Sequence, residues 1–492
     1  MYVIITLLYT TLFVFFIYRW KFFSIPSLSL RSISLLFILK IAAGICVWNV
    51  YTYYYESGDI HLFYDDAERL YQLLIKTPKE FIKVIFQDDP SSKLMGWNSS
   101  FEPILYNDSR TIILMNLFFR FFSFGYVQVH TVFVNFLSLI GLMAIYKTFY
   151  PYFQNKKIEL LIAIFFIPSV LFWGSAILKE GLLFFGMGIL IYESNCGLRK
   201  SYSLNSIFKI LFSICILLVV KFYILFALLP GLIANRWEGK IAPKSILLKY
   251  LTVMFLCVFG LWVAASILPQ YNVLKIITDK QKKSFNYSQG GVFLSNSKEL
   301  IRVNYYKQDN ILIPLRDNLY QINPNSEYEI LESNNKKMIN KTSDDILFSK
   351  TYTMVPPKSI IAPLNLEPTI GSFIKNVPKA ITNTLTIPSI FEIDSWIKII
   401  PAIENLLICI GILVLPFYFK SNAEDLPIIY FCLTFTFLVF LLAGLTTPIV
   451  GALVRYKTPA LPFLMIIIFL STDKNKLKRN RCAKKNKRGL IH

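Results

Sequence analysis

The chain has 492 residues, of which 55% are hydrophobic and only 16% are charged, and its formal net charge is +21. Soluble domains carry about 25% charged residues, so this composition excludes a soluble multidomain protein and indicates an all-α polytopic membrane protein. Nine Lys or Arg residues lie in the tail after Asp473. Because that tail directly follows an apolar run, we expect it to contact anionic lipid in the cytoplasm rather than nucleic acid.

The apolar runs predict about eleven transmembrane helices (range about 9–13), since a spanning helix needs about 20 apolar residues. The runs are 2–18, 33–55, 127–147, 158–174, 177–193, 205–220, 222–235, 246–268, 399–419, 427–444 and 458–471. The first run lacks a preceding basic region and a small-residue cleavage site, so we expect a retained span rather than a signal peptide. Residues 205–235 fit either a hairpin of two spans or one long tilted span.

The distribution of Lys and Arg predicts the orientation of the spans. Basic residues cluster in the connections 19–31, 147–157, 199–200 and 236–244 and in the tail. The positive-inside tendency then places the amino terminus outside and the carboxyl terminus in the cytoplasm, provided that 158–193 and 205–235 are hairpins. The same assignment places the hairpin tips near Lys179 and Lys221, and the segment before the last span, on the outer side.

Four regions follow from this topology. Residues 1–268 form an N-terminal transmembrane module, whose extracytoplasmic loop 56–126 contains two expected interfacial helices, at 65–86 and 110–124. The loop 269–398 is extracytoplasmic and contains a small β-rich domain at about 285–360, since short alternating segments are separated there by Asn, Pro and Gly. Residues 399–471 form the C-terminal transmembrane helices, and 472–492 form the basic tail.

Cysteines give no sign of a disulfide framework or a metal site. The chain has seven, and their spacing matches no paired or metal-binding pattern. We expect them to be small buried hydrophobic residues.

The densest acidic cluster follows the second apolar run, in the stretch SGDIHLFYDDAERLY at 57–71. Asp59 and Asp66 are seven residues apart and share one face of a helix. A carboxylate at a dry interface acts as a general base toward a hydroxyl, and two carboxylates bind a divalent metal. The alternative is a solvated helix start. We expect Asp59 and Asp66 to be catalytic, or to hold any metal, with Asp65 secondary and His61 a bystander.

Isolated charges in apolar stretches cost free energy and therefore mark candidate sites. Lys179 and Glu180 follow an interruption by Pro168 and a Gly-Ser pair, as at a hairpin tip. They form an internal ion pair, or Lys179 points into an outer cavity and binds an anion. Lys221 is a single charge in a long uncharged stretch and is a candidate phosphate ligand, with snorkelling to the interface as the alternative.

Arg455 and Lys457 precede the last span on the expected outer side, against the positive-inside tendency. An arginine there can bind a phosphate bidentately, and simple headgroup contact is the alternative. Glu404, inside the run 399–419, is an expected partner of one of these cations. Together the charges predict a cavity at the outer leaflet, in which cations hold the phosphate of a lipid-linked donor and a carboxylate activates an acceptor hydroxyl.

Several of these stretches resemble the GT-C class of membrane glycosyltransferases, which use polyprenyl-phosphate sugars. GDIHLFYDDA is similar to the first outer loop of that class, where an acidic residue is catalytic or binds metal, and Asp59 and then Asp66 match it. FWGSAILKEG is similar to a related segment. VRYKTPALPFL resembles an Arg-Tyr-x-x-Pro-x-x-Pro-Phe ending of bacterial members, matched by Arg455, Tyr456, Pro459, Pro462 and Phe463. VKFYILFALLPGL resembles a basic–aromatic–proline segment, matched by Lys221, Tyr223 and Pro230.

The chain also departs from that class. Its acidic residues Asp65 and Asp66 are adjacent, in place of an Asp-Glu or Asp-x-Asp pair. The β-rich insertion is not general to the class either. The resemblance therefore implies a type of reaction and leaves the substrate open.

The resemblance implies an inverting transfer of a sugar from a polyprenyl-phosphate donor to an envelope glycan, lipid or protein acceptor. It places this transfer at the outer face of a bacterial inner membrane. The donor phosphate would be bound by Lys179, Lys221, Arg455 and Lys457, with Glu180, Glu404 and Tyr456 in secondary roles. The implied partners are the lipid-linked donor and membrane lipids, without nucleic acid, and a divalent metal stays open as a cofactor. The alternatives are an O-antigen-type polysaccharide polymerase or ligase, a lipid-linked-saccharide transporter or flippase, and an envelope scaffold.

Overall fold

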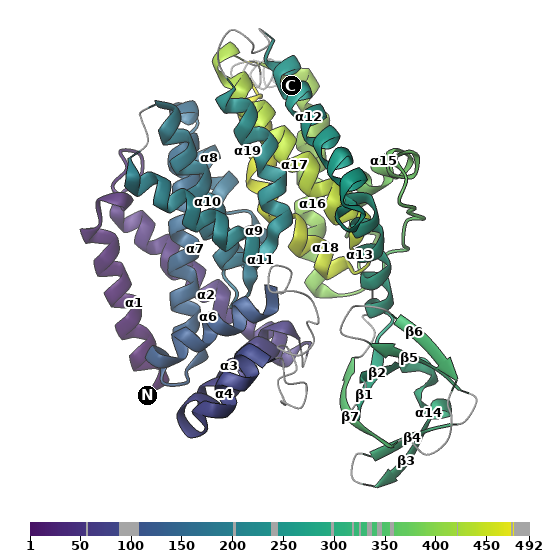
Figure 1. The fold of residues 1–492 in the computed structure, drawn as a ribbon. Helices are drawn as coiled ribbons and strands as arrows, with labels where there is room; N and C mark the ends of the chain where they lie inside the picture. Colours follow the sequence, from purple (N-terminus) through teal and green to yellow (C-terminus); the bar gives the residue numbers. More distant parts are fainter. Residues whose placement is uncertain are drawn as a thin grey trace, which may run out of the picture.

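The computed structural model describes residues 1–55, 58–87, 108–199, 203–237, 245–296, 300–316, 319–323, 326–331, 337–341, 347–354, 359–420, 422–473 and 476. A bundle of helices forms most of the molecule, and a small antiparallel sheet lies to one side of it (Figure 1). The helices are α1 (Tyr2–Arg19), α2 (Leu30–Tyr53), α3 (Asp59–Lys76), α4 (Pro78–Gln87), α6 (Asp108–Ser123), α7 (Val127–Phe149), α8 (Lys157–Phe165), α9 (Pro168–Trp173), α10 (Lys179–Arg199), α11 (Leu204–Arg236), α12 (Ile246–Ile267), α13 (Val273–Ser288), α14 (Gln308–Ile311), α15 (Ile370–Thr386), α16 (Ile399–Val414), α17 (Leu426–Thr446), α18 (Val450–Lys457) and α19 (Leu461–Leu470).

Within the described residues, eight helical segments are long and apolar enough to cross a bilayer. They are Tyr2–Arg19, Leu30–Tyr53, Val127–Phe153, Leu204–Arg236, Ile246–Ile267, Trp396–Tyr418, Ala423–Thr446 and Val450–Leu470. The molecule is therefore an all-α membrane protein with a small sheet, but the expected count of about eleven spans is not confirmed. The runs 158–174 and 177–193 lie in helices outside this set, and the two runs of 205–235 share one helix.

The segment between α9 and α10 reverses the chain, as expected of a hairpin tip. Pro168 begins α9 at a position where its missing N–H costs nothing. After Trp173 the helix ends, and the carbonyls of the following Gly-Ser pair are bonded by side chains from other helices. Lys40 and Ser138 donate to the Gly174 oxygen at 3.0 and 2.7 Å, and Asn135 donates to the Ser175 oxygen at 2.9 Å. Three buried polar side chains thus satisfy backbone acceptors that a bilayer would leave unbonded.

Helix α11 also folds back on itself. Lys221 has non-helical backbone angles (φ −154°, ψ 81°), which break the helix near its middle. A straight helix would separate Lys209 from Asn235 by about 39 Å. Both instead lie beside the carboxyl end of α10, because Lys209 pairs with Glu193 at 2.8 Å and Asn235 shares a small cavity with Asn195. Of the two expectations for 205–235, the structure agrees with the hairpin, whose tip is Lys221.

Close helix packing brings these hairpins together at the centre of the bundle. Helices α7 and α10 touch at their backbones: a Cβ on Gly141 would lie 2.1 Å from the Phe184 oxygen, and one on Gly188 would lie 2.0 Å from the Gly141 oxygen. Small residues let helices approach this closely where water supplies no driving force. α10 therefore serves as the axis of the bundle, with α7 on one side and α11 on the other.

Three amphipathic helices, α3, α4 and α6, lie across one end of the bundle near the amino terminus (Figure 1). Helices α3 and α4 together cover the first expected interfacial segment, 65–86, and α6 covers most of the second, 110–124. The loop between α4 and α6 falls outside the described residues. Glu68 of α3 accepts from the Arg120 guanidinium of α6, and the buried His130 of α7 bonds Asn116 and Ser123 of α6. These polar contacts fix the layer on the ends of α2 and α7.

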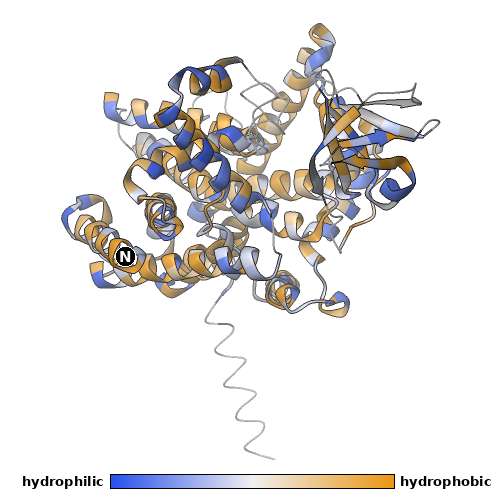
Figure 2. Cartoon of the chain, turned by 90° about the horizontal axis from the view of Figure 1, so that it is seen from below, coloured by the Kyte–Doolittle hydropathy of each residue, from blue (hydrophilic) through white to orange (hydrophobic). Residues whose placement is uncertain are grey.

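The strands are β1 (Gly291–Ser295), β2 (Leu300–Val303), β3 (Leu312–Arg316), β4 (Leu319–Ile322), β5 (Glu327–Leu331), β6 (Lys337–Lys341) and β7 (Leu347–Met354), in the sheet order β3-β4-β7-β1-β2-β5-β6. All pairs are antiparallel, and Val292 opposes Val303. This confirms a β-rich domain at the expected place. Its strands mix hydrophilic and hydrophobic residues beside the apolar helices (Figure 2). The amphipathic helix α13, which leads into it, was not predicted as a helix.

Candidate functional site

Four charged side chains from distant parts of the chain form one hydrogen-bonded cluster. Glu180 Oε1 accepts from Lys221 Nζ and from Arg455 Nε, both at 2.8 Å. The NH1 group of Arg455 then donates to Asp59 Oδ2 at 3.0 Å. We call these four residues, Asp59, Glu180, Lys221 and Arg455, the charge cluster. All four were candidates from the sequence, and the cluster brings the acidic loop, both hairpin tips and the segment before the last span together.

Local structure explains why each residue reaches this point. Asp59 is the first residue of α3, and Gly58 before it has φ +143°, which favours glycine. Glu180 is the second residue of α10, directly after the reversal at 174–178. Lys221 is the tip of the α11 hairpin, and Arg455 lies in the last turn of the short helix α18. Each residue thus lies at an end or a break of a helix, where a side chain can leave the lipid-facing wall.

Solvent exposure increases across the charge cluster from Glu180 to Asp59. The exposed fraction of the side chain is 0% for Glu180, 3% for Lys221, 9% for Arg455 and 56% for Asp59. A buried charge is tolerated when it is paired and hydrogen-bonded, and here one deep carboxylate serves two cations. Glu180 therefore fixes the positions of Lys221 and Arg455, whereas Asp59 stands at the open rim.

Aromatic rings complete the walls around the two cations. Lys221 Nζ lies 4.7 Å from the centre of the Tyr456 ring, and the Arg455 guanidinium lies 5.9 Å from that of Trp173. Such contacts stabilise a desolvated cation by about 0.5–2 kcal/mol. Tyr456 was a secondary candidate from the sequence, whereas Trp173 was missed.

Lys179 belongs to the same end of α10 but not to the charge cluster. Its ammonium lies 3.5 Å from the Ser109 hydroxyl of α6 and 5.2 Å from the centre of the Phe63 ring of α3. The expected alternative of an internal ion pair between Lys179 and Glu180 is wrong, because Glu180 pairs with Lys221 and Arg455 instead. Lys179 thus contributes positive charge to the layer formed by α3 and α6.

Lys457 and Glu404 occupy different surroundings from those expected. Lys457 Nζ donates to the Thr384 oxygen at 2.8 Å and to Asn405 Oδ1 at 2.6 Å, so it binds the carboxyl end of α15. Glu404 accepts from the backbone N–H and the hydroxyl of Ser169, at 2.7 and 2.8 Å. It therefore hydrogen-bonds the amino end of α9, and its charge also acts on the nearby Lys457, one of the two expected partners. Both residues support helix ends, where the backbone leaves donors or acceptors unbonded.

Asp65 and Asp66 lie on α3 outside the charge cluster. Asp66 is fully buried, and its Oδ1 lies 3.9 Å from NH1 of the Arg69 guanidinium. Asp65 is exposed on α3, but partial desolvation there still raises the pKa of its carboxyl. Asp59 bonds to Arg455 at the exposed start of the helix, so the two expected catalytic carboxylates, Asp59 and Asp66, lie in different surroundings. His61 bonds to Thr52, and burial lowers the pKa of its ring.

The described residues contain no group of three or more His, Cys, Asp or Glu side chains arranged to hold a metal ion. Asp59 and Asp66, the candidates for such a site, differ sharply in exposure, and Asp59 already binds a guanidinium.

Sequence reasoning missed the residues that support the charge cluster from behind. Lys40 of α2 is 2% exposed, and its ammonium donates to the Gly174 oxygen and the Ser175 hydroxyl, each at 3.0 Å. It thereby fixes the reversal that leads to Glu180. The signal was available: Lys40 is a lone charge in the apolar run 33–55, and such charges are costly unless they have a role.

The fold and the charge cluster define this molecule as a polytopic membrane protein with a polar site at the ends of its helices. Comparison of the chain with known protein families, with characterised proteins and with solved structures finds no match.

Proposed function

We propose that this protein is a membrane glycosyltransferase that moves a sugar from a polyprenyl-phosphate donor to an envelope acceptor. The observation that supports this most directly is the joining of Asp59 to Arg455, and of Arg455 and Lys221 to Glu180, in one cluster. Two oriented cations suit a phosphate, and an adjacent exposed carboxylate suits an acceptor hydroxyl. The lipid-linked donor and bilayer lipids are then its partners.

The electrostatics of this end of the bundle favour an anion. Three helical segments begin here: α3 at Asp59, α10 at Lys179 and the second arm of α11 after Lys221. A helix start carries about half a positive charge and free N–H donors, and anions bind there readily. An approaching phosphate therefore meets three helix starts in addition to Arg455.

The arrangement suggests how a bound phosphate prepares the base. The donor phosphate displaces Asp59 from Arg455 NH1, while Glu180 keeps Arg455 and Lys221 in place. The released Asp59 accepts the proton of the acceptor hydroxyl as its oxygen attacks the anomeric carbon. The bond from that carbon to the phosphate oxygen breaks on the opposite face, and polyprenyl phosphate leaves. This is an inverting transfer, and its reacting groups are the donor, the acceptor hydroxyl and the Asp59 carboxylate.

The proposal includes an orientation in the membrane. The charge cluster lies at the same end as α3, and the connections near Lys147, Lys156 and Arg236 lie at the other. The positive-inside tendency then places the charge cluster and the amino terminus outside, and the carboxyl terminus in the cytoplasm, in a bacterial inner membrane. The donor would enter from the outer leaflet.

Binding of polyprenyl phosphate to the purified protein in nanodiscs tests this mechanism. Arg455→Met is expected to weaken binding by about tenfold or more, since a hydrogen bond to a charged group contributes about 1.5–3 kcal/mol. Asp59→Asn is expected to tighten binding about two- to fivefold, because it removes a competing pair worth up to about 1 kcal/mol. The same variant should abolish sugar transfer from a panel of polyprenyl-phosphate sugars.

The opposite sign of the two effects makes the test specific. Glu80→Gln is a matched control, because Glu80 is an exposed acidic residue of the nearby helix α4, and it should leave binding and transfer unchanged. If Asp59→Asn weakens binding as much as Arg455→Met, the displacement step is wrong. If neither variant changes binding, the phosphate is bound elsewhere and the proposed function loses its main support.

A further inference from the structure

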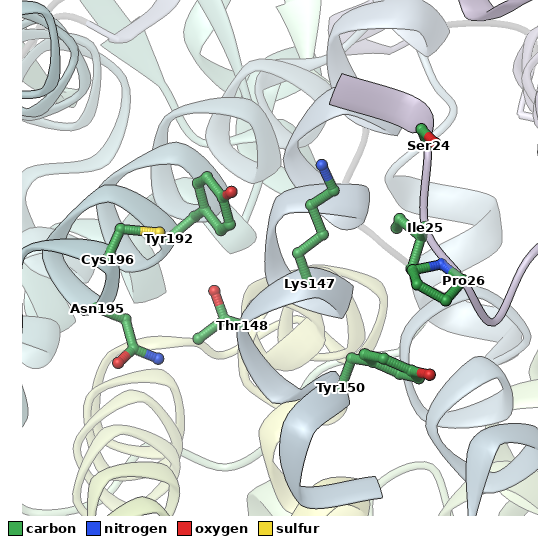
Figure 3. Close-up of a pocket in the computed structure, with 9 residues that line it drawn as sticks. All are labelled: Ser24, Ile25, Pro26, Lys147, Thr148, Tyr150, Tyr192, Asn195 and Cys196. Carbon is green, nitrogen blue, oxygen red and sulfur yellow. The ribbon is translucent and has the colours of Figure 1, made fainter. Parts of the chain in front are cut away.

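A hollow lies at the opposite end of the bundle from the charge cluster. Its volume is about 260 Å³, and it is bounded by the connection after α1, the end of α7 and the end of α10. Figure 3 shows Lys147 and Thr148 between Tyr192 and Cys196 on one side and Ser24 to Pro26 on the other. We call this hollow the Lys147 pocket. Tyr192 lies twelve residues after Glu180 on α10, about 18 Å along the helix, so the two sites are separate.

Lys147 carries a positive charge that the described residues do not neutralise. Its ammonium lies 4.3 Å from the centre of the Phe22 ring and 5.8 Å from that of Tyr192. No carboxylate within the described ranges lies within 4 Å of it. The acidic residue next to Tyr192, Glu193, is paired with Lys209 at 2.8 Å. A half-buried ammonium held between rings, with no counter-ion in the part of the chain that the structure describes, is a ready partner for an anion.

The surroundings place the Lys147 pocket at the level of lipid headgroups. Trp20 packs against the rings of Phe22 and Phe23 just after α1 ends, and Tyr150 lines the pocket just after α7 ends. Aromatic residues gather at the boundary between hydrocarbon and water in membrane proteins. The pocket wall also includes the apolar side chains of Ile25 and Pro26. It therefore offers one cation, several polar groups and an apolar side at an interfacial depth.

We propose that the Lys147 pocket binds the phosphate of a membrane phospholipid from the leaflet opposite the charge cluster. The Lys147 ammonium pairs with the phosphate, and the hydroxyls and amide of Thr148, Tyr192 and Asn195 bond the glycerol and headgroup oxygens. The first methylenes of the acyl chains pack on Ile25 and Pro26. The proposed site does not depend on the proposed transfer reaction, because it lies at the other end of α10.

The size of the Lys147 pocket agrees with part of a lipid rather than a whole soluble ligand. Pockets that enclose drug-sized molecules have volumes of about 300–1,000 Å³. A hollow of about 260 Å³ is sufficient for a phosphate and its glycerol. The acyl chains then remain outside in the bilayer, where their burial needs no protein. Such a lipid would bridge the α1–α2 connection and α10, two elements that otherwise meet through Phe22 and Tyr192.

Cys196, in the wall of the pocket, supplies a direct reporter. The full-length protein in detergent is titrated with short-chain phosphatidylglycerol, and alkylation of Cys196 by N-ethylmaleimide is followed by peptide mass spectrometry. Binding should slow this alkylation about tenfold at a lipid concentration about ten times the dissociation constant. Cys215, an exposed thiol of α11, is the internal control and should react at an unchanged rate.

Two alternative ligands and two variants show which part of the lipid is recognised. Diacylglycerol of the same chain length, which lacks the phosphate, and inorganic phosphate alone should give no protection. Lys147→Met should abolish protection. Lys157→Met, which removes an exposed charge at the start of α8, is the matched control and should retain protection. Protection by diacylglycerol would show that only apolar contact matters, and protection by inorganic phosphate would show a site for free anions. Either result, or full protection in Lys147→Met, would overturn the proposal.

Discussion

Glu180→Gln tests whether one deep carboxylate stabilises the meeting of the hairpins. The substitution leaves Lys221 and Arg455 buried at 3% and 9% exposure, with an amide in place of their shared carboxylate. Removing one partner of a buried ion pair costs about 3–5 kcal/mol. Arg455 keeps Asp59, so most of this cost should fall on Lys221. We expect the free energy of unfolding to drop by about 3–5 kcal/mol.

A double-mutant cycle separates the charge effect from general damage. Glu180→Gln leaves the charge cluster with one excess positive charge, and Lys221→Met leaves it with one excess negative charge. The charge cluster of the double variant is again neutral. Its loss in free energy of unfolding should therefore be smaller than the sum of the losses in the two single variants, with a coupling of up to about 3 kcal/mol. Reversible unfolding in mixed detergent, followed by circular dichroism, measures all four proteins.

The matched control is on the same helix. Glu193 of α10 also has a lysine at 2.8 Å, but that lysine, Lys209, is 44% exposed. Glu193 is itself 7% exposed, but its substitution leaves Lys209 with access to water, so Glu193→Gln should cost less than Glu180→Gln. If Glu180→Gln costs no more than Glu193→Gln, or if the two losses in the cycle simply add, the shared carboxylate does not stabilise the fold as argued.

The other predictions concern the support of the site. Lys40→Met should destabilise the fold by about 1–3 kcal/mol, because it removes a buried donor to the backbone. Lys40→Arg should recover less than full stability if the larger guanidinium does not fit beside the Ser175 hydroxyl. Gly44→Ala should cost about 1–3 kcal/mol by overpacking, since a Cβ there would lie 2.3 Å from the Ser175 oxygen; unchanged thermal unfolding would contradict this. Burial raises the pKa of the Glu68 carboxyl, but hydrogen bonds from Arg120 and Gln72 outweigh it and lower that pKa overall. Its stabilising contribution should be present above its ordinary pKa of about 4.3 and lost as the pH falls through the lowered value. Glu68→Gln should therefore reduce the difference in stability between pH 6 and pH 3, and an unchanged difference would be evidence against the pair.

Much of the architecture was predictable because its signals are local. Apolar runs identify most of the long helices, and alternating segments with Asn, Pro and Gly identify the sheet near residues 291–354. The Gly-Ser interruption before Lys179 indicated one reversal. The distribution of Lys and Arg favoured a second near Lys221, although one long tilted span also fitted residues 205–235. The meeting of Asp59 with Arg455 was inferred from a shared side of the membrane, and the structure agrees with it.

Other features depend on contacts that no local pattern contains. Whether a buried cation binds a carboxylate or a carbonyl is decided by which helix end lies opposite it. Lys457 faces the end of α15 and so binds the Thr384 oxygen, although its sequence context resembles that of Arg455 two residues earlier. Glu404 faces the start of α9. Periodicity correctly placed Asp66 on a shared face with Asp59, but it could not tell that one end of that face is buried and the other exposed.

The shared carboxylate has a consequence for how the chain is assembled during synthesis. Glu180 emerges first, Lys221 follows forty-one residues later, and Arg455 arrives only near the end of translation. A lone charge in lipid costs several kcal/mol, so the first hairpin is poorly retained in the bilayer until the second one neutralises it. The two hairpins should therefore leave the translocation machinery as a pair. A nascent chain truncated between them should stall or be degraded, whereas one truncated after residue 237 should be stably inserted.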